Sequence, residues 1–140
     1  MIYLDTSVVV PLFVPEPASN ALDAWYESCT DYLVSSDWIV TEFASALSIK
    51  VRRGAIAEKQ AAAAWKDFDA FCRTGLRLAP VSRQAFDVAA RLARDVASGL
   101  RAGDALHLAM ALEVGAAGLA TADGTLESNA KSRGLTVNRF

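Results

Sequence analysis

Short apolar runs alternate with longer segments of helical periodicity along this chain, and that alternation limits the folds open to it. The apolar runs predict strands at 2–4, 32–34, 76–79, 118–121 and 135–137. The segments between them predict helices at 18–29, 38–53, 57–73, 83–97 and 104–114. Apolar strands that alternate with helices are typical of a parallel sheet covered on both faces, and such sheets bind their ligands at the carboxyl ends of the strands.

Residues at the ends of these segments support the boundaries. Asp37 is expected to cap the helix that begins at Trp38, and Ser82 the helix that begins at Arg83. Glycines stand where helices should end, at positions 54, 75, 99 and 115. No linker, repeat or low-complexity tract interrupts the sequence, so we expect a single domain over 1–140.

The composition is that of a globular chain, and it is apolar enough that part of its surface is expected to lie against a partner. Hydrophobic residues make up 53% and charged residues 21%, and the mean hydropathy is +0.23, which excludes disorder and favours an oligomer or complex. The net charge of −2 gives no global sign of nucleic-acid binding. Basic residues do cluster locally, at Lys50, Arg52, Arg53 and at Lys131, Arg133, Arg139. Each cluster is explained either as a solvated helix end or as a contact to a phosphate backbone.

Features of location and redox state are few. The chain begins without a basic leader, and its most apolar stretch, 105–120, is broken by His107, Glu113 and two glycines. We therefore expect a cytoplasmic protein with no membrane span. Cys29 and Cys72 follow no motif and are expected to be free thiols.

Two aspartates follow expected strands. Asp5 comes directly after the first apolar run, and Asp123 comes just after the run at 118–121. Both therefore fall on the edge where a parallel sheet places its chemistry. Each taken alone is explained about as well by a turn or a helix cap.

Two further acids occupy unusual helical positions. Glu42 lies outside the polar arc of its expected helix, with Trp38, Ile39 and Ala46 one turn away, where a carboxylate is costly without a compensating partner. Asp104 opens a segment that is apolar nearly all round, although an N-cap would explain it as well. His107, one turn further on, is expected to be a core histidine with a polar partner.

Together the four acids favour a metal site. Carboxylates gathered in one cleft repel one another, and a hard divalent cation such as Mg²⁺ or Mn²⁺ relieves that repulsion. Such an ion also activates water for attack on a phosphate. One histidine excludes a histidine acid–base pair, and the sequence contains no standard zinc set, nucleophile elbow, Walker loop or dinucleotide fingerprint.

Four short motifs in order resemble the PIN-domain ribonucleases over almost the whole chain. They are Leu4-Asp5-Thr6-Ser7, Thr41-Glu42-Phe43-Ala44, Gly103-Asp104-Ala105-Leu106 and Thr121-Ala122-Asp123-Gly124. At this length the chain is similar to the VapC-type toxins of bacterial toxin–antitoxin pairs. The resemblance implies an α/β fold, a three-layer α/β/α sandwich around a five-stranded parallel sheet of order 3-2-1-4-5.

The resemblance also implies a site and partners. Asp5, Asp104 and Asp123 would bind Mg²⁺ or Mn²⁺, and Glu42 would bind the metal directly or through water. Thr6, Ser7 and Thr121 would supply supporting hydrogen bonds. The implied activity is hydrolysis of RNA by a metal-activated water, leaving 5′-phosphate and 3′-hydroxyl ends. The implied partners are a VapB-like antitoxin and a second copy of the chain, as a homodimer and, with antitoxin, a heterotetramer or larger assembly.

Three alternatives remain open on sequence alone. A PIN-fold nuclease acting on DNA would use the same acids, because contacts to the 2′-hydroxyl are not readable from sequence. A phosphoacceptor receiver domain would want an acidic pair after the first strand, whereas Thr6 and Ser7 follow Asp5. A non-catalytic interaction module would be expected to lack one of the acids, and none is missing.

Overall fold

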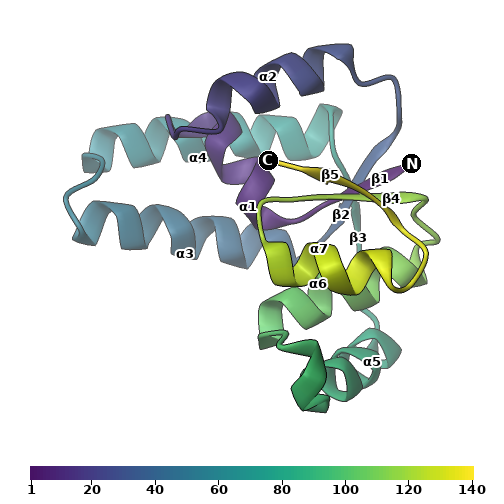
Figure 1. The fold of residues 1–140 in the computed structure, drawn as a ribbon. Helices are drawn as coiled ribbons and strands as arrows, with labels where there is room; N and C mark the ends of the chain where they lie inside the picture. The colour runs from purple at the N-terminus through teal and green to yellow at the C-terminus, as the bar shows by residue number, and fades with distance from the viewer.

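Five parallel strands form one sheet, in the order β3-β2-β1-β4-β5, in a computed structural model that describes residues 1–140 (Figure 1). The strands are β1 (Ile2–Leu4), β2 (Leu33–Ser36), β3 (Arg77–Ala79), β4 (Gly118–Thr121) and β5 (Thr136–Arg139). The helices are α1 (Thr6–Phe13), α2 (Ser19–Ser28), α3 (Trp38–Arg52), α4 (Glu58–Thr74), α5 (Arg83–Arg94), α6 (Ala102–Glu113) and α7 (Gly124–Lys131), with a short 3₁₀ turn at Val96–Ser98. The expected sheet order is confirmed.

Successive residues of each strand face opposite layers, and this places a core on each side of the sheet. Tyr3 and Leu119 pack with α5, α6 and α7, whereas Leu4 and Ala120 pack with α1 to α4. In the central strand Tyr3 pairs with Val34 on one side and with Leu119 on the other. The three-layer α/β/α arrangement is therefore confirmed.

Two helices, α1 and α7, were not predicted from the sequence. Helix α1 is a run of β-branched residues with Pro11 inside it, features that disfavour a helix, yet burial of its valines overrides that preference. Helix α7 is short and polar and begins at a glycine. Strand β2 also extends through Ser36 rather than ending at Val34, because both serine hydroxyls find buried partners, Ser35 on the Leu4 carbonyl and Ser36 on Tyr3.

Several boundary expectations are confirmed and two are wrong. The Ser82 hydroxyl accepts a hydrogen bond from Ala85 N–H and caps α5. Asp37 precedes α3, but its side chain makes no capping hydrogen bond, since its backbone is already helical. The segment expected as one helix from 83 to 97 ends at Arg94 and continues as the 3₁₀ turn. The glycines at 54, 99 and 115 have positive φ and follow helices as expected.

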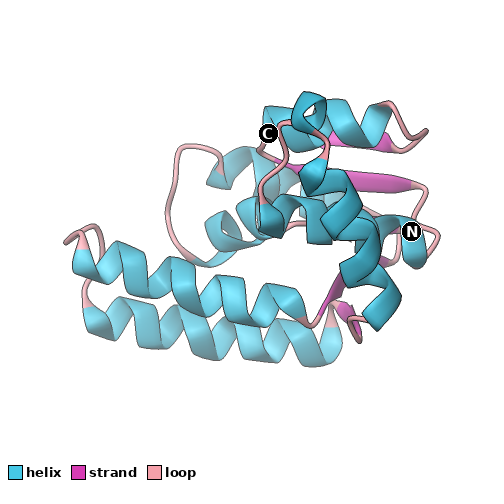
Figure 2. Cartoon of the chain, turned by 90° about the horizontal axis from the view of Figure 1, so that it is seen from below, coloured by secondary structure: helices cyan, strands magenta, loops and turns pink.

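Helices α3 and α4 pack against each other as a hairpin that extends beyond the sheet (Figures 1 and 2). Aromatic side chains hold it together, with the Phe43 and Phe68 rings stacked at a centroid distance of 3.9 Å. Because Phe43 directly follows Glu42 in the sequence, this stack fixes the part of α3 from which Glu42 projects. Cys29 and Cys72 are free thiols. No helix has the length and apolar character needed to cross a bilayer.

Candidate active site

The four acids line one cavity of about 300 Å³ at the carboxyl edge of the sheet. Asp5 follows β1 and opens α1, while Asp123 follows β4 and opens α7. Asp104 lies in the first turn of α6, and Glu42 projects from α3. The cavity wall contains Asp5, Thr6, Ser7, Glu42, Ser45, Ala46, Ile49, Asp104, His107 and Asp123. Adjacent parallel strands and the helices that follow them thus bring together acids that are far apart in sequence.

Asp5 is the most deeply buried of the acids, with only 3% of its surface exposed. Its Oδ1 accepts hydrogen bonds from the Ser7 backbone N–H at 2.8 Å and the Ser7 hydroxyl at 2.6 Å, and its Oδ2 accepts one from the Thr121 hydroxyl at 2.6 Å. Burial raises the pKa of this carboxyl above its ordinary value, although the neighbouring His107 and these hydrogen bonds oppose the rise. The same hydrogen bonds fix the orientation of the carboxylate.

Asp104 and Asp123 add negative charge to the same cavity. Burial raises the pKa of Asp104, and the charges of Asp123 and Asp5 raise it further. Asp123 caps α7 by accepting a hydrogen bond from Leu126 N–H through Oδ1 at 2.7 Å. Asp5 and Asp123 are therefore helix caps, as one of the two interpretations left open by the sequence had it, and both also line the cavity at the carboxyl edge.

Glu42 is held differently from the aspartates. Its side chain is 27% exposed, and its Oε2 accepts hydrogen bonds from the Thr6 hydroxyl and from His107 Nε2, the latter at 2.6 Å. Burial by itself would raise the pKa of Glu42, but the hydrogen bond and charge of His107 and the hydrogen bond of Thr6 lower it below its ordinary value. The indole N–H of Trp38 also lowers this pKa, although it is buried without a hydrogen-bond partner.

The three residues expected to support the acids all contact them. Thr6 bonds Glu42, and Ser7 bonds Asp5. Thr121 joins two acids, because its hydroxyl donates to Asp5 and accepts from the Asp123 backbone N–H at 2.9 Å. The Ser7 hydroxyl likewise accepts from the backbone N–H of Ala122 at 2.7 Å, which ties α1 to the end of β4.

Sequence interpretation missed a buried hydrogen-bonded group behind Glu42. His107 is a core histidine with polar partners, as expected, but those partners are Tyr3 and Glu42. Tyr3 bonds Ser36 in turn, and burial raises the pKa of the Tyr3 phenol to about 12. The available signal was a single histidine three residues after Asp104 on an otherwise apolar helix.

The chemistry of the donor set fits a hard divalent cation. Asp5 and Asp104 are carboxyls whose pKa values are raised by burial and, for Asp104, also by the charges of Asp123 and Asp5, and carboxylate oxygens are the ligands of Mg²⁺ and Mn²⁺. No three acidic, histidine or cysteine side chains stand close enough to form a complete ligand cage. Mg²⁺ rarely uses such a cage, because it keeps several waters and binds one or two carboxylates.

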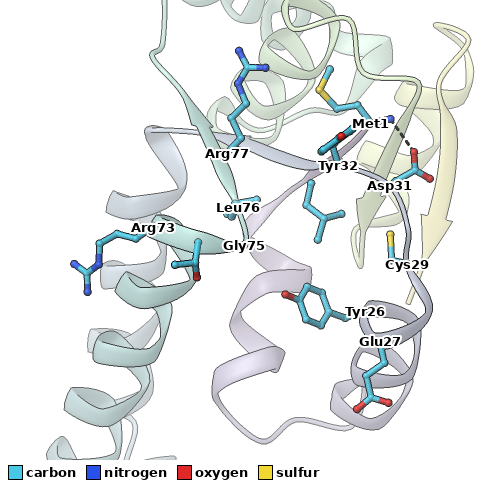
Figure 3. Close-up of a pocket in the computed structure, with 12 residues that line it drawn as sticks. Met1, Tyr26, Glu27, Cys29, Asp31, Tyr32, Arg73, Gly75, Leu76 and Arg77 are labelled. Atoms are coloured by element: carbon cyan, nitrogen blue, oxygen red, sulfur yellow. Dashed lines mark hydrogen bonds and ion pairs between the residues drawn. The ribbon is translucent and has the colours of Figure 1, made fainter.

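A larger cavity, of about 790 Å³, lies at the opposite, amino edge of the sheet (Figure 3). Tyr26, Tyr32, Arg73 and Arg77 line it, and the amino group of Met1 forms an ion pair with Asp31 at its rim. None of the four acids of the carboxyl edge contributes to it. The larger cavity is therefore not the one that the four acids line, and cavity size alone would not identify the candidate site.

The sheet order and the acids at its carboxyl edge define a PIN-like α/β protein. A sequence model of the PIN domain matches residues 2–132, and the chain belongs to the PIN domain family. Ribonuclease VapC45 and Ribonuclease VapC49, from two strains of Mycobacterium tuberculosis, are each 35% identical to this chain over 142 residues, covering 98% of it and 94% of the relative.

Solved structures show the same fold at lower sequence identity. VapC20 of Mycobacterium tuberculosis, described as a sarcin–ricin loop cleaving toxin, superposes with a TM-score of 0.73 at 20% identity, covering 92% of this chain and 95% of that one. FitAcB of Neisseria gonorrhoeae gives a TM-score of 0.68 at 19% identity over 98% of this chain and 96% of that one. The structure of VapBC2 of Rickettsia felis bound to a DNA fragment from its promoter gives a TM-score of 0.66 at 18% identity, covering 99% of this chain and 98% of that one.

Proposed function

We propose that this chain is a metal-dependent endoribonuclease and the toxin of a VapBC-like toxin–antitoxin pair. The observation that carries the proposal is the meeting of Asp5, Glu42, Asp104 and Asp123 on one cavity at the carboxyl edge of the sheet. Relatives that are 35% identical over nearly their full length and are named ribonuclease VapC support it.

In this proposal Asp5, Asp104 and Asp123 hold the metal partly through its bound waters, because the three carboxylates do not stand close enough for all of them to bind it directly. Asp5 is already oriented by Ser7 and Thr121, so little side-chain freedom is lost on binding. Mg²⁺ or Mn²⁺ bound by these acids supplies charge neutralisation at the phosphate and lowers the pKa of water. The aspartates bring the negative charge that attracts such an ion and fix where it binds.

Glu42 has a separate task. It is ionised at neutral pH, since its pKa lies below the ordinary value, and it accepts a hydrogen bond from the attacking water and thereby orients it. Attack in line on the scissile phosphorus breaks its bond to the 3′-oxygen, which takes a proton from solvent water, and leaves a 5′-phosphate and a 3′-hydroxyl. The chain's one histidine is buried against Tyr3 and Glu42, so it is not free to serve as an acid on the leaving oxygen.

The test compares the purified chain with its Asp5→Asn variant on structured cellular RNAs and on single-stranded DNA of the same sequences. Cleavage of RNA is expected with Mg²⁺ or Mn²⁺ and is expected to stop with chelator or in the variant. Product ends are identified by their sensitivity to a 5′-phosphate-dependent exonuclease. Activity that survives both the chelator and the substitution, or 2′,3′-cyclic phosphate ends, overturns the mechanism, and cleavage of DNA alone supports the DNA-specific alternative.

The toxin role has its own test in cells. Induced expression of the chain alone is expected to arrest bacterial growth, and co-expression of a short adjacent reading frame with a DNA-binding N-terminus is expected to restore it and to co-purify with the chain. The Asp5→Asn variant is the matched control, because it should still bind the antitoxin without arresting growth. Harmless expression together with no bound neighbour contradicts this part of the proposal. Light scattering of the purified chain tests the homodimer.

A further inference from the structure

His107, the only histidine of the chain, is buried at the centre of a hydrogen-bonded series that ends on Glu42. Only 2% of its surface is exposed. Its Nδ1 lies 3.0 Å from the Tyr3 hydroxyl, and its Nε2 lies 2.6 Å from Glu42 Oε2. Tyr3 is in turn 2.9 Å from the hydroxyl of Ser36. The series therefore joins β2, β1, α6 and α3.

The chemistry of these groups fixes the direction of the last bond. An ionised carboxylate can only accept hydrogen bonds, so His107 Nε2 carries a proton and donates it to Glu42. The Thr6 hydroxyl donates to the same oxygen. Glu42 Oε2 is thus held from two sides, by His107 in the second turn of α6 and by Thr6 at the start of α1.

The other oxygen of Glu42 lies against the backbone of α6. A Cβ atom on Gly103 would stand 2.5 Å from Glu42 Oε1 and 3.6 Å from Trp38 Nε1. Because the α6 backbone at Gly103 stands this close to Oε1, the carboxylate has little room to move toward α6. A glutamate side chain ordinarily rotates about three bonds, and here Thr6, His107 and Gly103 restrict it.

We propose that His107 is a positioning residue that, together with Thr6, holds the Glu42 carboxylate in one orientation at the wall of the aspartate cavity, and that Tyr3 and Ser36 hold His107 in turn. The inference rests on the proposed function, because orienting Glu42 matters for catalysis only if the cavity is a nuclease site. Supporting hydrogen bonds of this kind set the orientation of catalytic groups and act on turnover through them.

The arrangement can be tested without RNA or metal. Since the chain has a single histidine, histidine labelled with ¹⁵N in the ring gives signals from His107 alone in an NMR spectrum. We expect Nε2 to be protonated and its proton to exchange slowly with water. Glu42→Gln is expected to shift the Nε2–H signal and Tyr3→Phe the Nδ1 signal. An Nε2–H signal unchanged by Glu42→Gln overturns the proposal, whether or not the protein cleaves RNA.

The effect on turnover is tested with two substitutions of the histidine. His107→Leu removes the donor to Glu42, whereas the amide of His107→Gln can reach the same oxygen. We expect the leucine variant to lower kcat about 100-fold with KM for RNA unchanged, and the glutamine variant to recover at least about tenfold of that loss. Leu108→Val on the same helix is the control, since it perturbs the buried core without touching Glu42.

The outcomes separate a positioning role from a structural one. A merely structural histidine would lower thermal stability in both variants and leave kcat per folded molecule unchanged, which overturns the proposal. If His107→Leu does not fold, Tyr3→Phe replaces it, with an expected fall in kcat of about tenfold. If the unaltered chain cleaves no RNA, the proposed function fails, and the ring signals still decide whether His107 holds Glu42.

Discussion

Asp5 has a structural task and, under the proposed function, a chemical task in the same side chain. As the N-cap of α1 it satisfies the Ser7 backbone N–H, and as a buried carboxylate it faces the cavity that Asp104 and Asp123 also line. The two tasks need different properties, since capping needs an oxygen acceptor and cation binding needs a charge. A substitution that keeps the acceptor and removes the charge should therefore separate them.

Asp5→Asn is expected to leave folding intact and to abolish catalysis. Asparagine caps helices as well as aspartate does, so the helix start is preserved. Loss of the charge should lower kcat at least about 100-fold and remove the response to Mg²⁺. Circular dichroism and RNA cleavage measured on the same preparation check both halves. Retention of full activity in a folded variant would contradict the assigned role.

Thr121 is expected to matter through its hydroxyl alone. Thr121→Val keeps the shape but leaves Asp5 Oδ2 and the Asp123 N–H without their shared partner, at a cost of about 1–3 kcal/mol in unfolding free energy. Cleavage should fall about 10-fold, because Asp5 loses one of its orienting bonds. Thr121→Ser retains the hydroxyl and is the matched control. Urea unfolding and initial rates measure the two effects, and equal behaviour of both variants would refute the assignment.

Among the helices, α6 contributes most to the site in its first two turns. Gly103 gives room to Glu42, Asp104 lines the cavity, and His107 bonds Glu42 from behind. The helix is otherwise packed in the core that covers one face of the sheet. Its position is thus fixed by apolar burial, and its polar residues depend on that position for their geometry.

Gly103→Ala is expected to lower the catalytic activity without lowering the stability of the protein. Alanine is favoured over glycine in a helix by about 1 kcal/mol, so the substitution alone should not weaken α6. The added methyl group would stand 2.5 Å from Glu42 Oε1 and must push the carboxylate out of place. We expect kcat to fall about 10- to 100-fold with a thermal midpoint unchanged or higher. Gly115→Ala, where a Cβ meets nothing within 4 Å, controls for the loss of a glycine, although its positive φ should cost some stability.

Helices were predicted well where periodicity was strong and poorly where tertiary contacts decide. The segment at 38–53 carries a clear apolar stripe, and α3 ends within one residue of that expectation. Helix α1 has no such stripe because Val8, Val9 and Val10 are all buried, so its pattern resembles a strand. The sequence feature that indicated the start of α1 was Asp5, which the sequence left undecided between a helix cap and a catalytic acid.

For the molecule as a whole, the sequence predicted which acids meet but not how they are partnered. Strand ends and the parallel sheet were enough to place Asp5 and Asp123 on one edge. The bond from His107 to Glu42 joins residues 65 apart in sequence, and such a pairing leaves no periodic trace. The partners of Tyr3 and Ser36 were missed for the same reason, since each depends on the packing of α6 over the sheet.

The pH dependence of stability follows from the opposite pKa shifts in the cavity. A carboxyl whose pKa is raised on folding stabilises the protein below its unfolded pKa, and this contribution is lost as the pH rises through the folded pKa. Asp5 and Asp104 are of this kind, with pKa values above the ordinary 3.8. Glu42 is the reverse, and its contribution is lost only as the pH falls below about 4.5, its ordinary value.

Above about pH 4.5, the ordinary value for Glu42, only the two aspartates among these three carboxyls should still change the stability, and the metal-free protein is expected to become less stable as the pH rises through their raised pKa values. Under the proposed function Mg²⁺ would bind the ionised acids of the folded state, so it should raise the thermal midpoint at pH 7 and have a smaller effect at pH 5. Thermal unfolding at constant ionic strength, with Mg²⁺ or an equivalent of NaCl, measures both trends. Asp104→Asn should flatten the pH trend and weaken the response to Mg²⁺. An unfolding midpoint at pH 7 that does not respond to Mg²⁺ would show that the repulsion in this cavity is not relieved by a cation, and would remove the metal from the proposed chemistry.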